Sequence, residues 1–295
     1  MELNSNGLRL PPPWISPAAG KPNREVPPVI TVPRRQQAGS YDTDAAAWIA
    51  LIEAADGQTL ETAVKDAYNA FVVGCKADAS LNAGVSNWAA TEQVLVFRGP
   101  RTLTGALITP KGLAVTNVGF VTGDYSRKVD LKGNGVKYIN ANRAPSADGQ
   151  NNASLWVNVN RAATTNNTKY AGCQDGAGQT TRVADNVSFF TASVNSLTIY
   201  SGPSGSAQST GFIGVARNSS SQITVRHGGV NYNFSSTSAT PLNLSYYLFS
   251  RNVSGLPNQG TDAGISAYGS GKAIDLALMG ARVETLMVAL AAAIP

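Results

Sequence analysis

The stretch Ile223-Thr-Val-Arg-His-Gly-Gly-Val-Asn-Tyr-Asn-Phe234 decides the fold class of this chain. Apolar residues alternate with polar ones on both sides of the Gly228-Gly229 pair. Period-two alternation predicts a strand with one buried face, and two such runs joined by two glycines predict a β-hairpin with a tight turn.

Further short strands are expected on both sides of this hairpin. They are residues 94–97, 155–160, 187–192, 197–200, 212–215, 246–251 and 267–268. Glycine, asparagine, serine and threonine fill the gaps between these runs. Many short strands separated by turn residues predict a mainly β, antiparallel jelly-roll sandwich.

Helical periodicity precedes and follows the strands. Residues 45–55 follow a capping sequence at 42–44, and a second apolar stripe runs to about residue 77, which together predict a helical hairpin. Residues 273–294 predict a C-terminal helix with an apolar stripe at Ile274, Leu278, Ala281, Leu286 and Leu290. The expected organisation is an arm at 1–41, a helical segment at 42–92, and a sandwich with its closing helix at 93–295.

The first 40 residues have a composition of their own. They contain 8 of the 15 prolines and a net charge of +3, whereas the remaining 255 residues carry +2. Proline fixes φ and removes an N–H donor, so an extended arm is expected. We expect it to anchor the protein to a partner surface; folding back onto its own body is the alternative. The expected contacts are Trp14, Ile15, Val29, Ile30, Arg34 and Arg35.

Composition excludes several classes of protein. A nearly neutral body does not provide the broad basic face of a nucleic-acid-binding domain. No uninterrupted apolar run reaches the roughly 18 residues of a membrane span, and the N-terminus lacks a signal-peptide pattern. Cys75 and Cys173 do not make a disulfide framework, and His227 is the only histidine. We therefore expect no nucleic acid, no membrane, no metal and no cofactor.

Catalytic carboxylates are sparse. Glycosidases need two carboxylates flanking the scissile bond, roughly 5–9 Å apart. No glutamate occurs between Glu92 and Glu284, and no two aspartates of the β region stand two residues apart on a strand. We expect a protein that is not an enzyme; a carbohydrate-active enzyme with carboxylates paired over long range is an alternative.

Aromatic side chains on the strands are candidates for sugar binding, because exposed rings stack on sugars. Trp156, Tyr170, Tyr232, Tyr246 and Tyr247 lie on expected strands, and His227 lies beside the glycine turn. We take Trp156, Tyr170, His227 and Tyr232 as the expected glycan contacts. Packing in the core is the alternative for each, since half of each strand faces inward.

The β region resembles a concanavalin-like (laminin-G-like) jelly-roll module of bacteriophage and prophage virion proteins. The resemblance covers roughly residues 45–294, and the arm lies outside it. It rests on Arg101-Thr-Leu-Thr-Gly-Ala-Leu107, on residues 116–128 and 131–143, and on the closing stretches 247–252 and 271–278.

This resemblance implies a structural protein of a phage particle, assembled in the host cytoplasm and located in the virion. A fibre, spike or receptor-binding component would contact other virion proteins through residues 1–40 and a host-surface carbohydrate through the sandwich. A homo-oligomer, and for a fibre a trimer, is expected by analogy. The alternative within the same resemblance is a capsid decoration or cement protein without a ligand.

Overall fold

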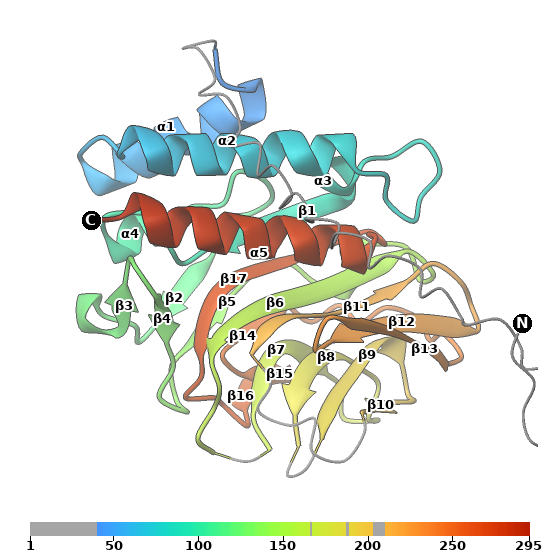
Figure 1. The fold of residues 1–295 in the computed structure, drawn as a ribbon. Coiled ribbons are helices and arrows are strands. Elements are labelled where there is room, and N and C mark those ends of the chain that lie inside the picture. Colours follow the sequence, from blue (N-terminus) through green and yellow to red (C-terminus); the bar gives the residue numbers. More distant parts are fainter. Residues whose placement is uncertain (1–39, 166, 187–188, 203–209) are drawn as a thin grey trace, which may run out of the picture. The chain divides into compact units, whose positions relative to one another are not determined.

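The structure is a computed structural model that describes residues 40–165, 167–186, 189–202 and 210–295. The chain divides into Met1–Ser40 and Tyr41–Pro295, and the fold lies in the second unit. Its described residues form two antiparallel β-sheets that pack face to face, with a layer of helices over one of them (Figure 1). The expected mainly β, jelly-roll-like sandwich is confirmed.

The helical hairpin begins and ends where the capping residues indicate. Helix α1 (Thr43–Asp56) follows Asp42, whose carboxylate accepts a hydrogen bond from the Asp44 N–H at 3.0 Å, and it ends at Gly57 with φ of 67°. This left-handed C-cap suits glycine. Helix α2 (Thr62–Ala77) buries its expected stripe. Shorter turns are α3 (Asn87–Ala90), α4 (Leu103–Ala106) and the 3-10 helices η1 (Thr122–Asp124) and η2 (Pro145–Ala147).

The closing helix is α5 (Leu276–Ala293), capped by the carboxylate of Asp275. Its existence is confirmed, but part of the expected apolar stripe is wrong. Leu278 and Ala281 are exposed, because the helix turns Met279 and Val283 toward the sheet instead. Among the described helices, α5 is also the one whose length and apolar composition would suit a membrane span. Here its buried face packs against a sheet and against α2.

The first sheet has the strand order β13-β12-β11-β6-β17-β4-β3, with β1 pairing β17 beside β4. The β12–β13 hairpin is the expected one, and its turn glycines have φ of 55° and 76°. The strands are β1 (Thr91–Val96), β3 (Tyr125–Ser126), β4 (Asp130–Lys132), β6 (Ala153–Arg161), β11 (Gly211–Arg217), β12 (Gln222–His227), β13 (Val230–Ser235) and β17 (Gly264–Gly271).

The second sheet has the order β10-β9-β8-β7-β14-β5-β2. The short strand β15 pairs β7 in parallel next to β14, and β16 pairs β15. The strands are β2 (Thr116–Val118), β5 (Tyr138–Asn140), β7 (Lys169–Gln174), β8 (Thr180–Asp185), β9 (Phe190–Ser196), β10 (Tyr200–Ser201), β14 (Tyr247–Leu248), β15 (Arg251–Val253) and β16 (Leu256–Asn258).

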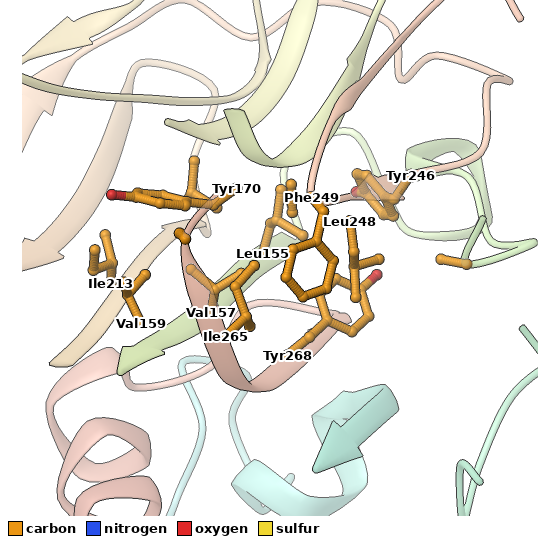
Figure 2. Close-up of a cluster of buried hydrophobic side chains, with 14 of the residues drawn as sticks. Leu155, Val157, Val159, Tyr170, Ile213, Tyr246, Leu248, Phe249, Ile265 and Tyr268 are labelled. Carbon is orange, nitrogen blue, oxygen red and sulfur yellow. The ribbon is translucent and has the colours of Figure 1, made fainter. Parts of the chain in front are cut away.

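Two hydrophobic cores hold the layers together. One lies between the sheets and contains Leu155, Val157 and Ile213 of the first sheet together with Leu248 of the second (Figure 2). The other lies between the opposite face of the first sheet and helices α1, α2 and α5. The central strands β6, β11 and β17 of the first sheet are therefore buried on both faces, whereas β13 at its edge is largely exposed. The helical segment at 42–92 shares this second core, and β1 begins at Thr91.

Candidate functional site

Two of the four expected glycan contacts are interior residues. Trp156 is 1% exposed and packs with Phe212 in the core beneath the helices, at a ring-centroid distance of 5.5 Å. Tyr170 is 0% exposed and lies in the core between the sheets, close to Val159 and Ile213 in Figure 2. Neither ring offers a face to a sugar, so the expectation for both is wrong. The alternative of core packing holds.

The other two expected contacts close one end of the sandwich. His227 is 5% exposed, not an exposed loop residue, because it shares the inward face of β12 with Val225. Its ring stacks on half-buried Tyr232 with centroids 4.7 Å apart and planes 12° apart, and the Tyr200 hydroxyl lies 3.4 Å from its Nε2. Burial lowers the pKa of His227. This packing gives His227 and Tyr232 a structural role; the expected glycan contact is wrong for His227.

The expected contacts of the arm lie outside the described residues. They are Trp14, Ile15, Val29, Ile30, Arg34 and Arg35.

The outward face of the second sheet has a glycine, Gly172 on β7, at its centre. Gly172 pairs with Arg182 on β8 and with Tyr247 on β14. Ala171, next in sequence, belongs to the core, so Gly172 and its two partners point away from it. A Cβ at position 172 would lie 2.5 Å from the Thr181 carbonyl oxygen. Glycine thus permits close approach of the strands, and Gly172 is itself buried between two large side chains.

A stacked pair of tyrosines borders this centre. Tyr247 and Tyr138 of β5 have ring centroids 4.5 Å apart and planes 26° apart. The Tyr247 hydroxyl donates to the Gly255 carbonyl at 3.1 Å, which fixes its ring, while Tyr138 is half-buried. Rings held in this way can support a sugar ring at low entropic cost.

Three cations lie around the same centre; we call Lys169, Arg182 and Arg251 the cationic cluster. Arg251 on β15 donates to the side-chain oxygens of Gln174, of Asn258 (2.7 Å) and of Gln259 (3.1 Å). Lys169 on β7 donates to the Asn167 side chain at 2.9 Å. These acceptors are neutral amides, so they orient the cations without neutralising them.

The charges of the cationic cluster repel one another. Burial and the neighbouring Arg182 and Arg251 lower the pKa of Lys169 to about 7, with Asp185 opposing the effect. Burial and Arg251 lower the pKa of Arg182 to about 10. Among the described residues, no ion pair joins any of the three to a carboxylate. Perturbed cations of this kind mark candidate functional sites.

The carboxylates of the β region are engaged elsewhere. Each of the seven aspartates accepts bonds that hold local structure: Asp124 from Lys137, Asp130 from Arg161, Asp148 from Arg143, Asp175 from the turn N–H groups of Ala177 and Gln179, Asp185 from the Tyr170 hydroxyl, Asp262 from Thr164, and Asp275 from the first turn of α5. The described residues contain no group of three or more side chains suited to hold a metal ion.

A cleft of about 610 Å³ lies on the other side of the molecule, between the second half of α5 and strands β6 and β11. Its lining is mostly apolar. Arg98 donates to the Met287 carbonyl at 2.9 Å, and the Asn158 amide donates to the Ser266 hydroxyl at 2.7 Å. The Nε–H of Arg98 has no acceptor among the described residues, but no second cation lines this cleft. Three cations gather on the second sheet, and we place the candidate site there.

Sequence reasoning found part of this site. Tyr247 was a candidate ring, and it does point outward, whereas its neighbour Tyr246 is buried in the core. Lys169, Arg182 and Arg251 were missed. The available signal was strand alternation, since Arg182 precedes the apolar Val183 on β8; the gathering of three strands around Gly172 has no local signal.

No protein-family model matches this chain, and no curated protein matches it. Among solved structures, a Trypanosoma rangeli sialidase in complex with 2,3-difluorosialic acid has a TM-score of 0.46 at 10% identity, over 76% of this chain and 38% of that one. The binding domain of botulinum neurotoxin serotype D has a TM-score of 0.45 at 11% identity, over 66% and 50%.

Domain 4 of a GH43 extracellular arabinanase from Geobacillus stearothermophilus, solved with arabinotriose, has a TM-score of 0.37 at 15% identity, over 58% of this chain and 82% of that one. The chain spans only 27% of the NanB sialidase of Streptococcus pneumoniae that it also matches. The likeness in all four cases is to a β-sandwich at low identity.

Proposed function

We propose that this protein is a non-enzymatic structural component of a bacteriophage virion that displays its sandwich outward and contacts host-surface carbohydrate. The virion assignment rests on the resemblance of residues 45–294 to the concanavalin-like module of phage proteins. The carbohydrate assignment rests on the outward face of the second sheet.

The observation that carries the carbohydrate assignment is the contrast between the two sheets. Helices α1, α2 and α5 cover the first sheet, whereas no described helix lies over the second (Figure 1). This face carries the Tyr138–Tyr247 stack, in which Tyr138 is half-buried and Tyr247 is 7% exposed. Beside it lie side chains with hydrogen-bonding capacity, among them Gln174 and Asn258. Rigid aromatic rings next to polar groups suit a sugar, which has apolar ring faces and hydroxyl edges.

The absence of turnover is part of the proposal. The seven aspartates of the β region are held in ion pairs, turns, a helix cap and hydrogen bonds from tyrosine and threonine. A pair of carboxylates used as acid and base would have to be released from these bonds. We expect the purified protein to bind glycans without cleaving them. Release of reducing sugar from a bound glycan would contradict this.

Residues 1–40 are the proposed anchor to other virion proteins. Deleting them should abolish incorporation into the particle while leaving Tyr41–Pro295 folded, because that segment is a separate compact unit. The particle would then lack the protein although the host still makes it. Normal incorporation of the truncated chain would refute the anchor.

Adsorption competition tests the receptor-binding role. The purified protein at saturating concentration should reduce phage adsorption to host cells, because free sandwiches occupy the surface glycan. Unimpaired adsorption favours the second candidate, a decoration protein, for which the whole outer face would be an inert cover. Labelling Pro295 and locating it by electron microscopy separates tail fibres from capsid shell.

A homo-oligomer, with a trimer as the first expectation, completes the proposal. The helical layer is its proposed contact surface, since Val73 on α2 and Val288 on α5 expose apolar side chains there. Replacing Val288 with Glu should then lower the oligomer mass measured by light scattering. A monomeric wild-type protein would remove this part of the proposal.

A further inference from the structure

The cationic cluster leaves a charge that the described protein does not balance. Lys169, Arg182 and Arg251 come from three different strands, β7, β8 and β15. Asp185 is the carboxylate whose charge acts on Lys169, and its side chain accepts a hydrogen bond from the Tyr170 hydroxyl. Two arginine charges and a lysine that is partly protonated at neutral pH thus face one negative charge. Buried charges that lack a counter-charge destabilise a fold, so such an arrangement calls for a partner.

Donor capacity remains on two of these side chains. Arg251 is 8% exposed, yet its Nε–H has no acceptor among the described residues. The Arg182 Nε–H is likewise without an acceptor, and no hydrogen bond from this guanidinium to any described residue is found. A guanidinium fork with free N–H groups matches the two oxygens of a carboxylate or sulfate.

The surroundings hold these donors in place. The amide oxygens of Gln174, Asn258 and Gln259 fix the guanidinium of Arg251. The missing side chain at Gly172 lets β7 and β8 approach closely beside Arg182. Prearranged donors lose little entropy when they bind a ligand. On the other side of Gly172, Tyr247 and Tyr138 provide the aromatic surface.

We infer that Lys169, Arg182 and Arg251 form an anion subsite, and that the ligand is an acidic carbohydrate. Its carboxylate or sulfate is held by the two arginines and the lysine, while the sugar ring lies toward the tyrosine stack. This inference rests on the proposed carbohydrate contact and narrows it to one class of glycan. Carboxylated and sulfated sugars share the chemistry, and the test separates them.

The test is calorimetric titration of the full-length protein with three matched trisaccharides. They are built from galactose, from galacturonic acid and from sulfated galactose. The wild type should bind at least one acidic sugar ten or more times more tightly than the neutral one, and added NaCl should weaken that preference. The tighter of the two acidic sugars identifies the group. Equal binding of all three would overturn the subsite and leave the proposed carbohydrate contact standing.

Substitutions test whether the preference for acidic sugars depends on the cationic cluster. Arg182→Gln should reduce acidic-sugar affinity at least tenfold while neutral-sugar affinity stays the same, and Arg182→Lys should retain part of the preference. The matched control is Arg226→Gln, another half-buried strand arginine that lies on the first sheet beside α5. Loss of the preference in the control, or its survival in Arg182→Gln, would overturn the assignment.

A second arm separates this inference from the function on which it rests. Inorganic sulfate should raise the melting temperature of the wild type but not of Arg182→Gln. If no sugar binds but sulfate gives this difference, the anion subsite stands and the carbohydrate function falls. If neither sugar nor sulfate binds, both are overturned.

Discussion

The outward face of each sheet places glycine next to large cross-strand side chains, but the glycines serve different purposes on the two sheets. On the first sheet, Trp156 of β6 lies between two cross-strand glycines, Gly214 of β11 and Gly269 of β17. On the second sheet, Gly172 lies between two large side chains, Arg182 and Tyr247. The glycines of the first sheet make room for a ring that helices then cover. The glycine of the second sheet lets β8 approach β7 closely and is itself buried beside the cationic cluster.

A glycine in a strand interior can serve either of two purposes. Glycine weakens a strand unless something needs the space above it. Over Gly269 that space is filled by the Trp156 indole, because a Cβ there would lie 2.3 Å from the ring. Over Gly172 no ring takes the space; instead a Cβ would meet the backbone of β8. The outward face of the first sheet is densely packed, whereas that of the second sheet gathers positive charges that repel one another.

The largest expected effect comes from breaking the packed face. Trp156→Ala should lower the free energy of unfolding by about 3–5 kcal/mol, since it removes a buried ring from between the sheet and α5. Denaturant unfolding followed by circular dichroism measures this. A loss below about 1 kcal/mol would mean that the packing of the helices on the sheet does not depend on the indole.

The two glycines should respond differently to rescue. Gly269→Ala and Gly172→Ala should each cost about 1–3 kcal/mol, because each places a Cβ under 3.0 Å from another atom. In the Trp156→Ala background, the cost of Gly269→Ala should largely vanish, because its obstacle is a side chain. Adding Arg182→Ala should not rescue Gly172→Ala, whose obstacles include the Thr181 carbonyl. Double-mutant cycles measure both couplings, and rescue at position 172 would contradict the comparison.

The sequence predicted the sandwich, the helical hairpin and the closing helix, because periodicity and capping residues are local. It failed where burial depends on a third layer. Trp156 alternates with Leu155 and Val157 as an outward residue should, and it is outward from the sandwich core; only the docking of α5 buries it. The cationic cluster could not be predicted from the sequence for a related reason. Lys169, Arg182 and Arg251 meet through the parallel pairing of β15 with β7, which no spacing along the chain encodes.

The titration of Lys169, on the outward face of the second sheet, should make the stability depend on pH. Lys169 has a pKa of about 7 in the folded protein against an ordinary value of 10.5, with Arg182, Arg251 and Asp185 facing it. Between pH 7 and 8.5 the unfolded chain therefore binds more protons, so the free energy of unfolding should rise with pH, by at least about 1 kcal/mol from this group.

Lys169→Met is the control for that slope. The difference in unfolding free energy between wild type and Lys169→Met cancels the buried thiols of Cys75 and Cys173, whose raised pKa values oppose the trend at higher pH. A difference that stays constant from pH 7 to 8.5 would show that Lys169 remains protonated, and would place the cluster in a more hydrated setting than the packing indicates.

The smallest expected change in stability is that of Arg182→Gln, and the fully buried Arg217 provides the contrast. Arg217, at the end of β11, donates to the carbonyls of Val194 (3.0 Å), Ser219 (3.1 Å) and Ser236 (2.8 Å). Arg217→Gln should therefore cost about 1.5–3 kcal/mol, as the loss of charged hydrogen bonds does. Arg182→Gln removes a charge that repels its neighbours and gives up no bond to a described residue, so unfolding free energy should stay within about 0.5 kcal/mol or rise. Thermal and denaturant unfolding of both variants measure the contrast. If Arg182→Gln lowers the free energy of unfolding as much as Arg217→Gln does, Arg182 supports the fold. The outward face of the second sheet would then be a second packed face rather than a binding surface.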